Sequence, residues 1–193
     1  IQFFEAQFQR HDQGQVPALN PFEQDVLPHL QGRVLDYGCG LGALSVALAE
    51  RGCQVCALDA SPTAISHLQA LAAQRALPID AREADLRTHE IGEPFDSIAS
   101  IGLLMFFDRP TALRQLSAIQ AHVQAGGVAA INVLVEGTTY LAMFDPAGYC
   151  LVSPAELRRQ FAGWQVLHER EQDFAAPGDT VKRFVTLVAR KPA

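Results

Sequence analysis

The chain has 193 residues, of which 49% are apolar and 19% charged, the composition of an ordinary folded protein that can bury a core as one domain. Its formal net charge of −6 offers no basic surface to a phosphate backbone, so we expect no nucleic-acid partner. No uncharged run approaches the roughly 18 apolar residues that cross a bilayer, so we expect no membrane partner either.

Cysteine and histidine are sparse. Four cysteines are too few for a disulfide framework, and Cys53 and Cys56 form a single C-x-x-C with no second pair to complete a zinc tetrad. Buried structural thiols are the favoured interpretation, with redox or metal use left as the alternative. No two of the six histidines have the H-x-x-x-H spacing. We predict no metal and a cytoplasmic location.

In chain order, the first 32 residues are expected to form a helical lid segment, with helices over residues 4–10 and 21–30. From residue 33 onward, short apolar strands alternate with amphipathic helices. The predicted strands are 33–37, 54–58, 79–83, 96–101 and 128–135, and the predicted helices are 43–51, 62–76 and 111–124. Such alternation indicates a mainly parallel sheet with helices on both faces.

The last forty residues change character. Ser153 and Glu156 spell a capping box that opens a helix ending near Phe161. Strands over 164–170 and 181–190, joined by a polar loop containing residues 177–179, predict an antiparallel hairpin added to the sheet. We therefore predict a single domain over 1–193, in which 33–193 form a Rossmann-like α/β core with a mainly parallel seven-stranded sheet.

The most informative stretch is the turn between the first strand and the first core helix, Asp36-Tyr37-Gly38-Cys39-Gly40-Leu41-Gly42. Its alternate glycines let the backbone approach a ligand, and the helix behind it presents unpaired N–H groups. The same glycines satisfy a relaxed dinucleotide fingerprint. A carboxylate at Asp36 would repel a pyrophosphate but suits a ligand with an ammonium and a sulfonium. Asp59, at the end of the second strand, is placed to accept ribose hydroxyls in either kind of protein.

The pattern Asp-x-Gly-x-Gly-x-Gly resembles motif I of the class I S-adenosylmethionine-dependent methyltransferases. The segment 84–86 is similar to their adenine-contacting acidic segment, and residues 94–96 to the entry of their fourth strand. The resemblance implies a Rossmann-like class I methyltransferase fold, S-adenosyl-L-methionine as the cofactor, and a cofactor site made of Asp36, Gly38, Cys39, Gly40, Gly42, Asp59, Ala60, Ala84, Asp85, Leu86, Ser100, Ile101 and Gly102.

A narrower resemblance is carried by residues 103–107, 156–164 and 183–191, which are similar to the tellurite-resistance methyltransferases of the TehB type. It extends over most of residues 20–191 and implies a small-molecule acceptor, either a chalcogen oxyanion (tellurite or selenite) or a thiol. Those methyltransferases have a His-Arg pair in the loop before the last strand. The corresponding predicted loop here, residues 171–179, contains no such pair. Arg183 remains as the candidate catalytic cation, and an ordinary strand-end arginine is the alternative.

Methyl transfer from a sulfonium needs alignment more than proton transfer. No residue is identified as a general base by its position, and His11 and His89 are the candidates. The loop over 136–151 is long enough to be a substrate lid. The alternative functions are an NAD(P)-dependent oxidoreductase and a non-catalytic cofactor-binding protein. The oligomeric state is left open.

Overall fold

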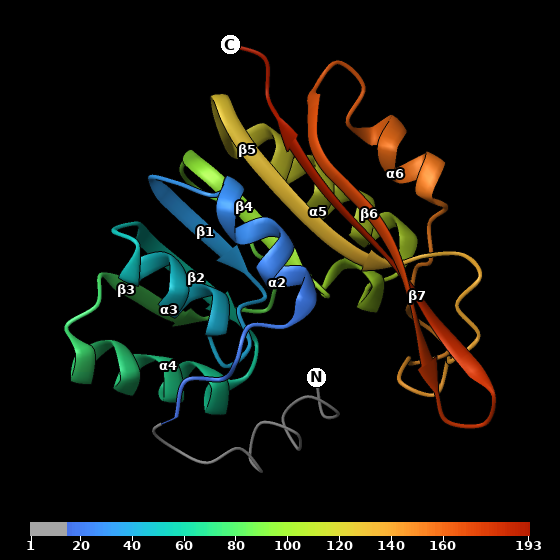
Figure 1. Ribbon diagram of the computed structural model, residues 1–193, viewed down its shortest axis with the longest axis horizontal. Helices are drawn as coiled ribbons and strands as arrows, with labels where there is room; N and C mark the ends of the chain where they lie inside the picture. Colours follow the sequence, from blue (N-terminus) through green and yellow to red (C-terminus); the bar gives the residue numbers. More distant parts are fainter. Residues whose placement is uncertain (1–14) are drawn as a thin grey trace.

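The computed structural model describes residues 15–193, and its centre is a seven-stranded sheet in the order β3-β2-β1-β4-β5-β7-β6 (Figure 1). The predicted helix over 4–10 lies outside the described residues. The strands are β1 (Arg33–Tyr37), β2 (Gln54–Asp59), β3 (Ile79–Glu83), β4 (Phe95–Ile101), β5 (Val123–Leu134), β6 (Gln165–Ala176) and β7 (Thr180–Arg190). The α-helices are α2 (Pro21–Val26), α3 (Ala43–Glu50), α4 (Pro62–Arg75), α5 (Arg109–His122) and α6 (Pro154–Gln160), with 3₁₀ turns η1 (Leu27–His29) and η2 (Leu104–Phe106).

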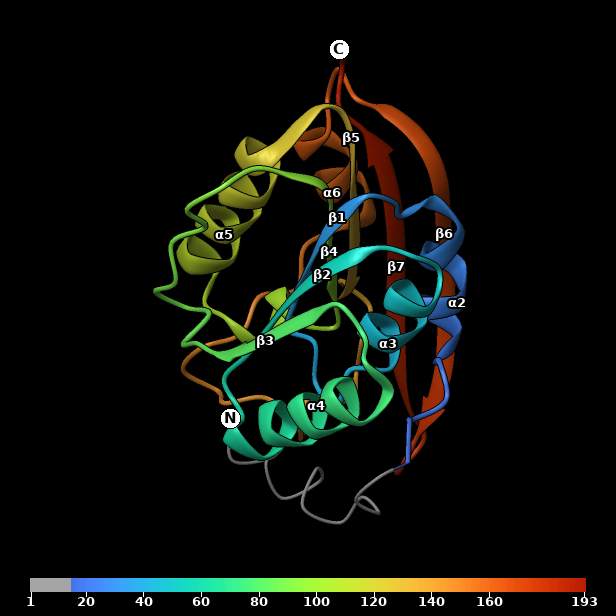
Figure 2. The ribbon, with the colours of Figure 1, turned by 90° about the vertical axis from the view of Figure 1, so that its left-hand side faces the viewer.

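The predicted fold class is confirmed. Strands β1 to β5 are parallel neighbours, and β7 pairs antiparallel with both β5 and β6. One apolar cluster joins α5, η2 and α6 to the sheet, and a second joins α2, η1, α3 and α4 to its other face (Figure 2). Burial on both faces explains why β1, β2 and β5 are largely apolar, whereas the edge strands β3 and β6 are rich in polar residues.

The strand order reverses at β1, which has β2 on one side and β4 on the other. In an open parallel sheet, the loops leaving two such strands diverge and leave a crevice at their carboxyl ends. The glycine-rich turn after Tyr37 lies at this point. The topology therefore places the predicted cofactor residues along one edge of the sheet.

Helix boundaries follow local capping. Ser61 accepts a hydrogen bond from the Ala64 amide at 3.0 Å and starts α4, as predicted. Helix α5 begins two residues earlier than predicted, because Asp108 caps it through the Thr111 amide at 2.8 Å. The helix predicted over 21–30 is α-helical only to Val26 and continues as a 3₁₀ turn, where Pro28 has no N–H to donate.

The capping box predicted for α6 is only half formed. Ser153 accepts from the Glu156 amide at 3.1 Å, but the Glu156 carboxylate pairs with Arg109 of α5. A tertiary ion pair has replaced the reciprocal contact that the local sequence suggested.

Two strands are longer than predicted. Strand β5 begins at Val123, not at 128, and includes Gly127, where a Cβ would lie 2.6 Å from the Asp96 carbonyl oxygen. Strand β6 runs to Ala176, so most of the predicted polar loop is strand and only residues 177–179 form the turn. Pairing with β7 satisfies the backbone of this polar stretch at the sheet's edge.

None of the helices in the described part of the chain is both long and apolar enough to cross a membrane.

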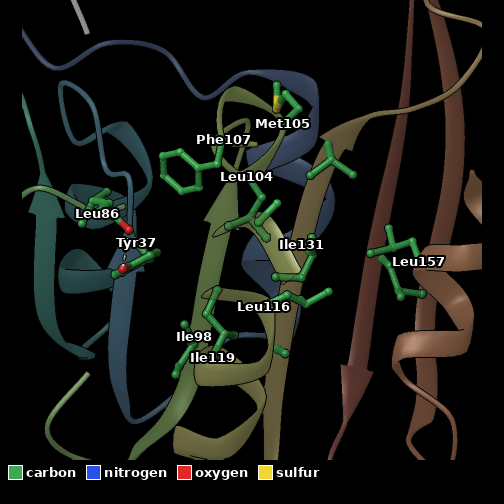
Figure 3. Packing of buried hydrophobic residues seen from close by; sticks show 14 of the residues in the cluster. Tyr37, Leu86, Ile98, Leu104, Met105, Phe107, Leu116, Ile119, Ile131 and Leu157 are labelled. Atoms are coloured by element: carbon green, nitrogen blue, oxygen red, sulfur yellow. Dashed lines mark hydrogen bonds between the residues drawn. The ribbon is translucent and has the colours of Figure 1, made fainter. Parts of the chain in front are cut away.

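Tyr37 ties the cofactor edge to the core. Its ring is fully buried, and its hydroxyl lies 3.2 Å from the Leu86 carbonyl oxygen and 3.1 Å from the Gln115 side-chain oxygen (Figure 3). These contacts join the end of β1, the loop after β3 and helix α5. The loop that carries the predicted adenine contact is therefore anchored from below.

We expect Tyr37→Phe to lower the free energy of unfolding by about 1 kcal/mol, because the buried partners of the hydroxyl stay behind without it. Urea unfolding measures the change. Tyr140→Phe is the matched control, since Tyr140 is only partly buried and its ring lies against Lys182. Equal losses in the two variants would contradict the anchoring role.

Candidate cofactor site

The turn after β1 is built on glycines in left-handed backbone conformations, with φ of +89° at Gly38, +51° at Gly40 and +83° at Gly42. Space demands glycine as well, because a Cβ at Gly42 would lie 2.5 Å from Leu68 of α4. The amide of Gly38 donates to the Leu58 carbonyl at 2.8 Å. The turn therefore rests on β2 and α4 and exposes its backbone on the other side, which is the geometry that a bound ligand needs.

Asp59 at the end of β2 holds this turn in place. One carboxylate oxygen accepts from the Gly40 amide at 2.9 Å, and the other accepts from the Ser61 amide at 2.9 Å. These two bonds join the turn to the start of α4 and fix the carboxylate at the crevice. Asp59 thus has a structural role, which the sequence did not predict, beside the predicted ribose contact.

Asp36 lies beneath the turn and is 2% exposed. The Ser45 hydroxyl of α3 donates to it at 2.6 Å. Burial raises the pKa of Asp36 to about 7, and the nearby Glu23 and Asp59 carboxylates push it in the same direction. A buried acid with this environment fits the ammonium group of S-adenosylmethionine, because a cation recovers the energy lost in desolvation.

The remaining predicted cofactor residues follow β2, β3 and β4 along the same edge. Ala60 directly follows Asp59, and the Ala84 amide donates to the Asp59 carbonyl at 2.9 Å. Asp85 pairs with Arg87, which lowers the pKa of the Asp85 carboxyl. Any contact of Asp85 with an adenine amino group would share that carboxylate with a guanidinium.

The residues at the end of β4 differ in accessibility. Ser100 is fully buried, and its hydroxyl has no hydrogen-bond partner among residues 15–193. Ile101 and Gly102 are partly exposed, and the Gly102 amide donates to the Asn132 carbonyl at 2.9 Å. Cys39 is buried, and burial raises the pKa of its thiol. The roles of these residues in cofactor binding stay predictions.

The candidate catalytic cation is engaged by a carboxylate. Arg183 on β7 binds Asp173 on β6 through two parallel hydrogen bonds of 2.9 Å. This pairing raises the pKa of Arg183 and lowers that of Asp173. Asp173 belongs to a stretch that the sequence suggested was a loop, and only the pairing of β6 with β7 places it opposite Arg183. An oxyanion at Arg183 would have to compete with it.

Aromatic rings gather where η2 meets the loop after β5. Phe106 and Phe144 have ring centroids 5.2 Å apart, and Phe144 stacks on Tyr149 at 4.8 Å. The Cys150 amide donates to the Met105 carbonyl at 3.0 Å, which docks the predicted lid loop onto η2. Of the candidate bases, His11 lies outside the described residues, and the His89 ring lies 6.2 Å from that of Tyr37.

The cysteines are free thiols. Within residues 15–193, no group of three His, Cys, Asp or Glu side chains is arranged to hold a metal ion.

Comparison with known proteins identifies the class. Residues 34–127, from β1 to the start of β5, match the family described as "Methyltransferase domain". The chain has the Rossmann-like fold of the S-adenosylmethionine-dependent methyltransferases. Within that class it resembles TehB: the crystal structure of TehB from Haemophilus influenzae superimposes with a TM-score of 0.76 at 23% identity, covering 90% of this chain and 62% of that one.

The curated relatives include two kinds of methyltransferase. A "Ubiquinone biosynthesis O-methyltransferase" from Xylella fastidiosa is 31% identical over 160 residues, covering 72% of this chain and 64% of the relative. The "Probable S-adenosyl-L-methionine-dependent methyltransferase TehB" of Haemophilus influenzae is 26% identical over 166 residues, covering 82% of this chain and 57% of the relative. The chain thus spans less than two thirds of the length of either relative.

We expect Asp36→Asn to stabilise the free protein in a pH-dependent way. A carboxyl with a raised pKa holds its proton longer in the folded state, so stability is lost as pH rises from 3.8 to about 7. Asparagine removes this loss. The gain in melting temperature over the natural chain should be larger at pH 8 than at pH 5, as thermal unfolding would measure, and equal gains at both pH values would contradict the buried charge.

We expect Asp59→Ala to weaken binding of S-adenosylhomocysteine roughly tenfold or more, since it removes a charged acceptor and releases the Gly40 amide. Isothermal titration calorimetry measures the affinity, with circular dichroism as a check on folding. Asp80→Ala is the control, because Asp80 is an exposed acid near the start of β3 paired with Arg82. Unchanged affinity in folded Asp59→Ala would remove Asp59 from the site.

Proposed function

We propose that the protein is an S-adenosylmethionine-dependent methyltransferase acting on a small-molecule acceptor. The observation that carries this proposal is the left-handed glycine turn at the switch point of the sheet, held by Asp59 and placed over the buried Asp36. The domain match supports the same cofactor. The oxidoreductase alternative has no comparable support, because a buried acid under the turn opposes a pyrophosphate.

When bound, the cofactor would supply a methyl group already activated by the sulfonium. The chain's own residues then have to bind the two reactants in line and exclude water, which is catalysis by proximity. The backbone of the glycine turn and Asp59 would position the donor. The aromatic rings of Phe106, Phe144 and Tyr149 would wall the acceptor side and keep water out.

For the acceptor we favour a soft nucleophile, and a thiol over a chalcogen oxyanion. The similarity to TehB supports both. An oxyanion would have to share the guanidinium of the candidate Arg183, however, because Asp173 occupies its Nε–Nη2 edge and offsets its charge. A thiolate would attack the methyl carbon as the bond from that carbon to the sulfonium sulfur breaks, leaving a methyl thioether and S-adenosylhomocysteine. This step uses no protein base once the thiol is ionised.

A phenolic hydroxyl is the second candidate acceptor. It is favoured by the 31% identity to a ubiquinone-biosynthesis O-methyltransferase, which exceeds the identity to TehB. The aromatic wall would suit a phenol ring. This chemistry would call for a base to remove the hydroxyl proton.

The test is a screen that measures release of S-adenosylhomocysteine with small thiols, tellurite, selenite, phenols and catechols. We expect turnover with thiols. Turnover only with phenols or catechols would contradict the soft-nucleophile proposal. Binding of S-adenosylhomocysteine with no turnover on any acceptor would favour a non-catalytic cofactor-binding protein.

Paired variants of the hairpin separate thiol from oxyanion. If the acceptor is a thiol, Asp173→Asn and Arg183→Ala should each leave KM within about twofold, because the exposed ion pair contributes little to binding a neutral or soft group. If it is an oxyanion, Asp173→Asn should lower KM by freeing the guanidinium, and Arg183→Ala should raise it. Steady-state kinetics on the best thiol and on tellurite measure both, and opposite shifts with the thiol would contradict our assignment.

A further inference from the structure

Helix α2 brings a carboxylate to the cofactor edge. A capping box closes its first turn, since Asn20 accepts from the Glu23 amide at 2.9 Å and Glu23 accepts from the Asn20 amide at 2.8 Å. The Glu23 side chain is thereby held against the protein and is partly buried. Helix α2 contacts β4, and β4 pairs with β1 at Asp36, which brings Glu23 toward Asp36. Burial raises the pKa of Glu23, and the charge of Glu23 contributes to the raised pKa of Asp36.

Neither carboxylate has a counter-charge. Among residues 15–193, no lysine, arginine or histidine forms an ion pair with Glu23 or Asp36. The neighbouring Asp25 does have one, with Arg170 of β6 at 3.2 Å. Two acids in a partly buried place repel each other unless a cation lies between them.

The helix cannot relieve this repulsion by turning away. Phe22 packs on Phe184 of β7 at 4.5 Å and on Phe174 of β6 at 5.6 Å. The Asp25–Arg170 pair ties the next turn to the same hairpin. In Figure 1, α2 crosses in front of the central strands beside β1. Glu23 is therefore held over the sheet face on which Asp36 lies.

A second, independent observation comes from β5. Asn132 is fully buried, and its amide nitrogen donates to the Thr186 hydroxyl at 3.0 Å and to the Val185 carbonyl at 3.4 Å. Because a carbonyl can only accept, the nitrogen faces β7 and the amide oxygen faces away from it. That oxygen has no hydrogen-bond partner within the described residues.

Strand alternation puts Asn132 on the α2 side of the sheet. Its neighbours Ala130 and Val188 on this face belong to the same apolar cluster as Val26 of α2. A buried acceptor without a donor is costly, so this oxygen indicates a ligand that carries N–H or other positively polarised hydrogens. The face of the sheet beneath α2 thus carries acceptors on three elements: Glu23 on α2, Asp36 on β1 and Asn132 on β5.

We propose that this face of the sheet, beneath α2, binds the amino-acid end of the cofactor and that Glu23 pairs with its ammonium group. The inference rests on the proposed function. If Asp59 binds the ribose at the end of β2, the amino-acid end extends across β1 toward β4 and α2, which is where these acceptors lie. Helix α2 is then part of the cofactor site and not only a lid.

The experiment compares two ligands by calorimetry: S-adenosylhomocysteine, which has the ammonium, and methylthioadenosine, which lacks the amino-acid end. Glu23→Gln is the test variant, because glutamine at this position preserves the capping box. We expect Glu23→Gln to weaken the binding of S-adenosylhomocysteine roughly tenfold and to leave the affinity for methylthioadenosine unchanged. The control Glu50→Gln removes the same charge at the far end of α3, where Glu50 only meets Arg75 on the surface, and should change neither.

Thermal unfolding supplies a second measurement. Removing one of two repelling acids should raise the melting temperature of free Glu23→Gln and shrink the further rise caused by S-adenosylhomocysteine. Equal weakening of both ligands, or weakening of neither, would overturn the role of Glu23 while leaving the cofactor assignment intact. A natural chain that binds neither ligand would instead overturn the proposed function.

Discussion

The Gly40 amide donates to the Asp59 carboxylate, and the rest of the cofactor edge is built around that bond. It joins the turn after β1 to the end of β2, so it forms only when the two strands are parallel neighbours in this register. Left-handed glycines let the turn reach Asp59 without a side chain in the way. The shape of the binding surface therefore depends directly on the pairing of β1 with β2.

This edge concentrates negative charge that the free protein does not neutralise. Asp36 is buried, and Glu23 and Asp59 add to the unfavourable field around it. Asp85, farther along the same edge, is paired with Arg87. Proteins are commonly less stable than they could be where a ligand must bind. Here the unfavourable term is repulsion between carboxylates, and a bound cation would relieve it. S-adenosylmethionine fits this edge, because it brings an ammonium and a sulfonium.

The hairpin serves the site in two ways. Its outer strand holds α2 in place through Phe174 and Arg170, and its inner strand carries Arg183 beside the end of β5. The ion pair of Arg183 with Asp173 makes that surface nearly neutral. The proposed acceptor side thus has apolar aromatic rings and an arginine whose charge is offset by Asp173. Such a surface favours a soft acceptor over a free oxyanion.

Short-range sequence was enough to locate the glycine turn, the caps and most strands, because dihedral preference and capping involve residues a few positions apart. It did not predict that residues 171–176 form strand, since their hydrogen-bond partners lie on β7. It also missed the partner of Arg183 and the place of Glu23 beside Asp36. Charge pairing and burial depend on which distant segments meet, and the tertiary structure alone brings those segments together.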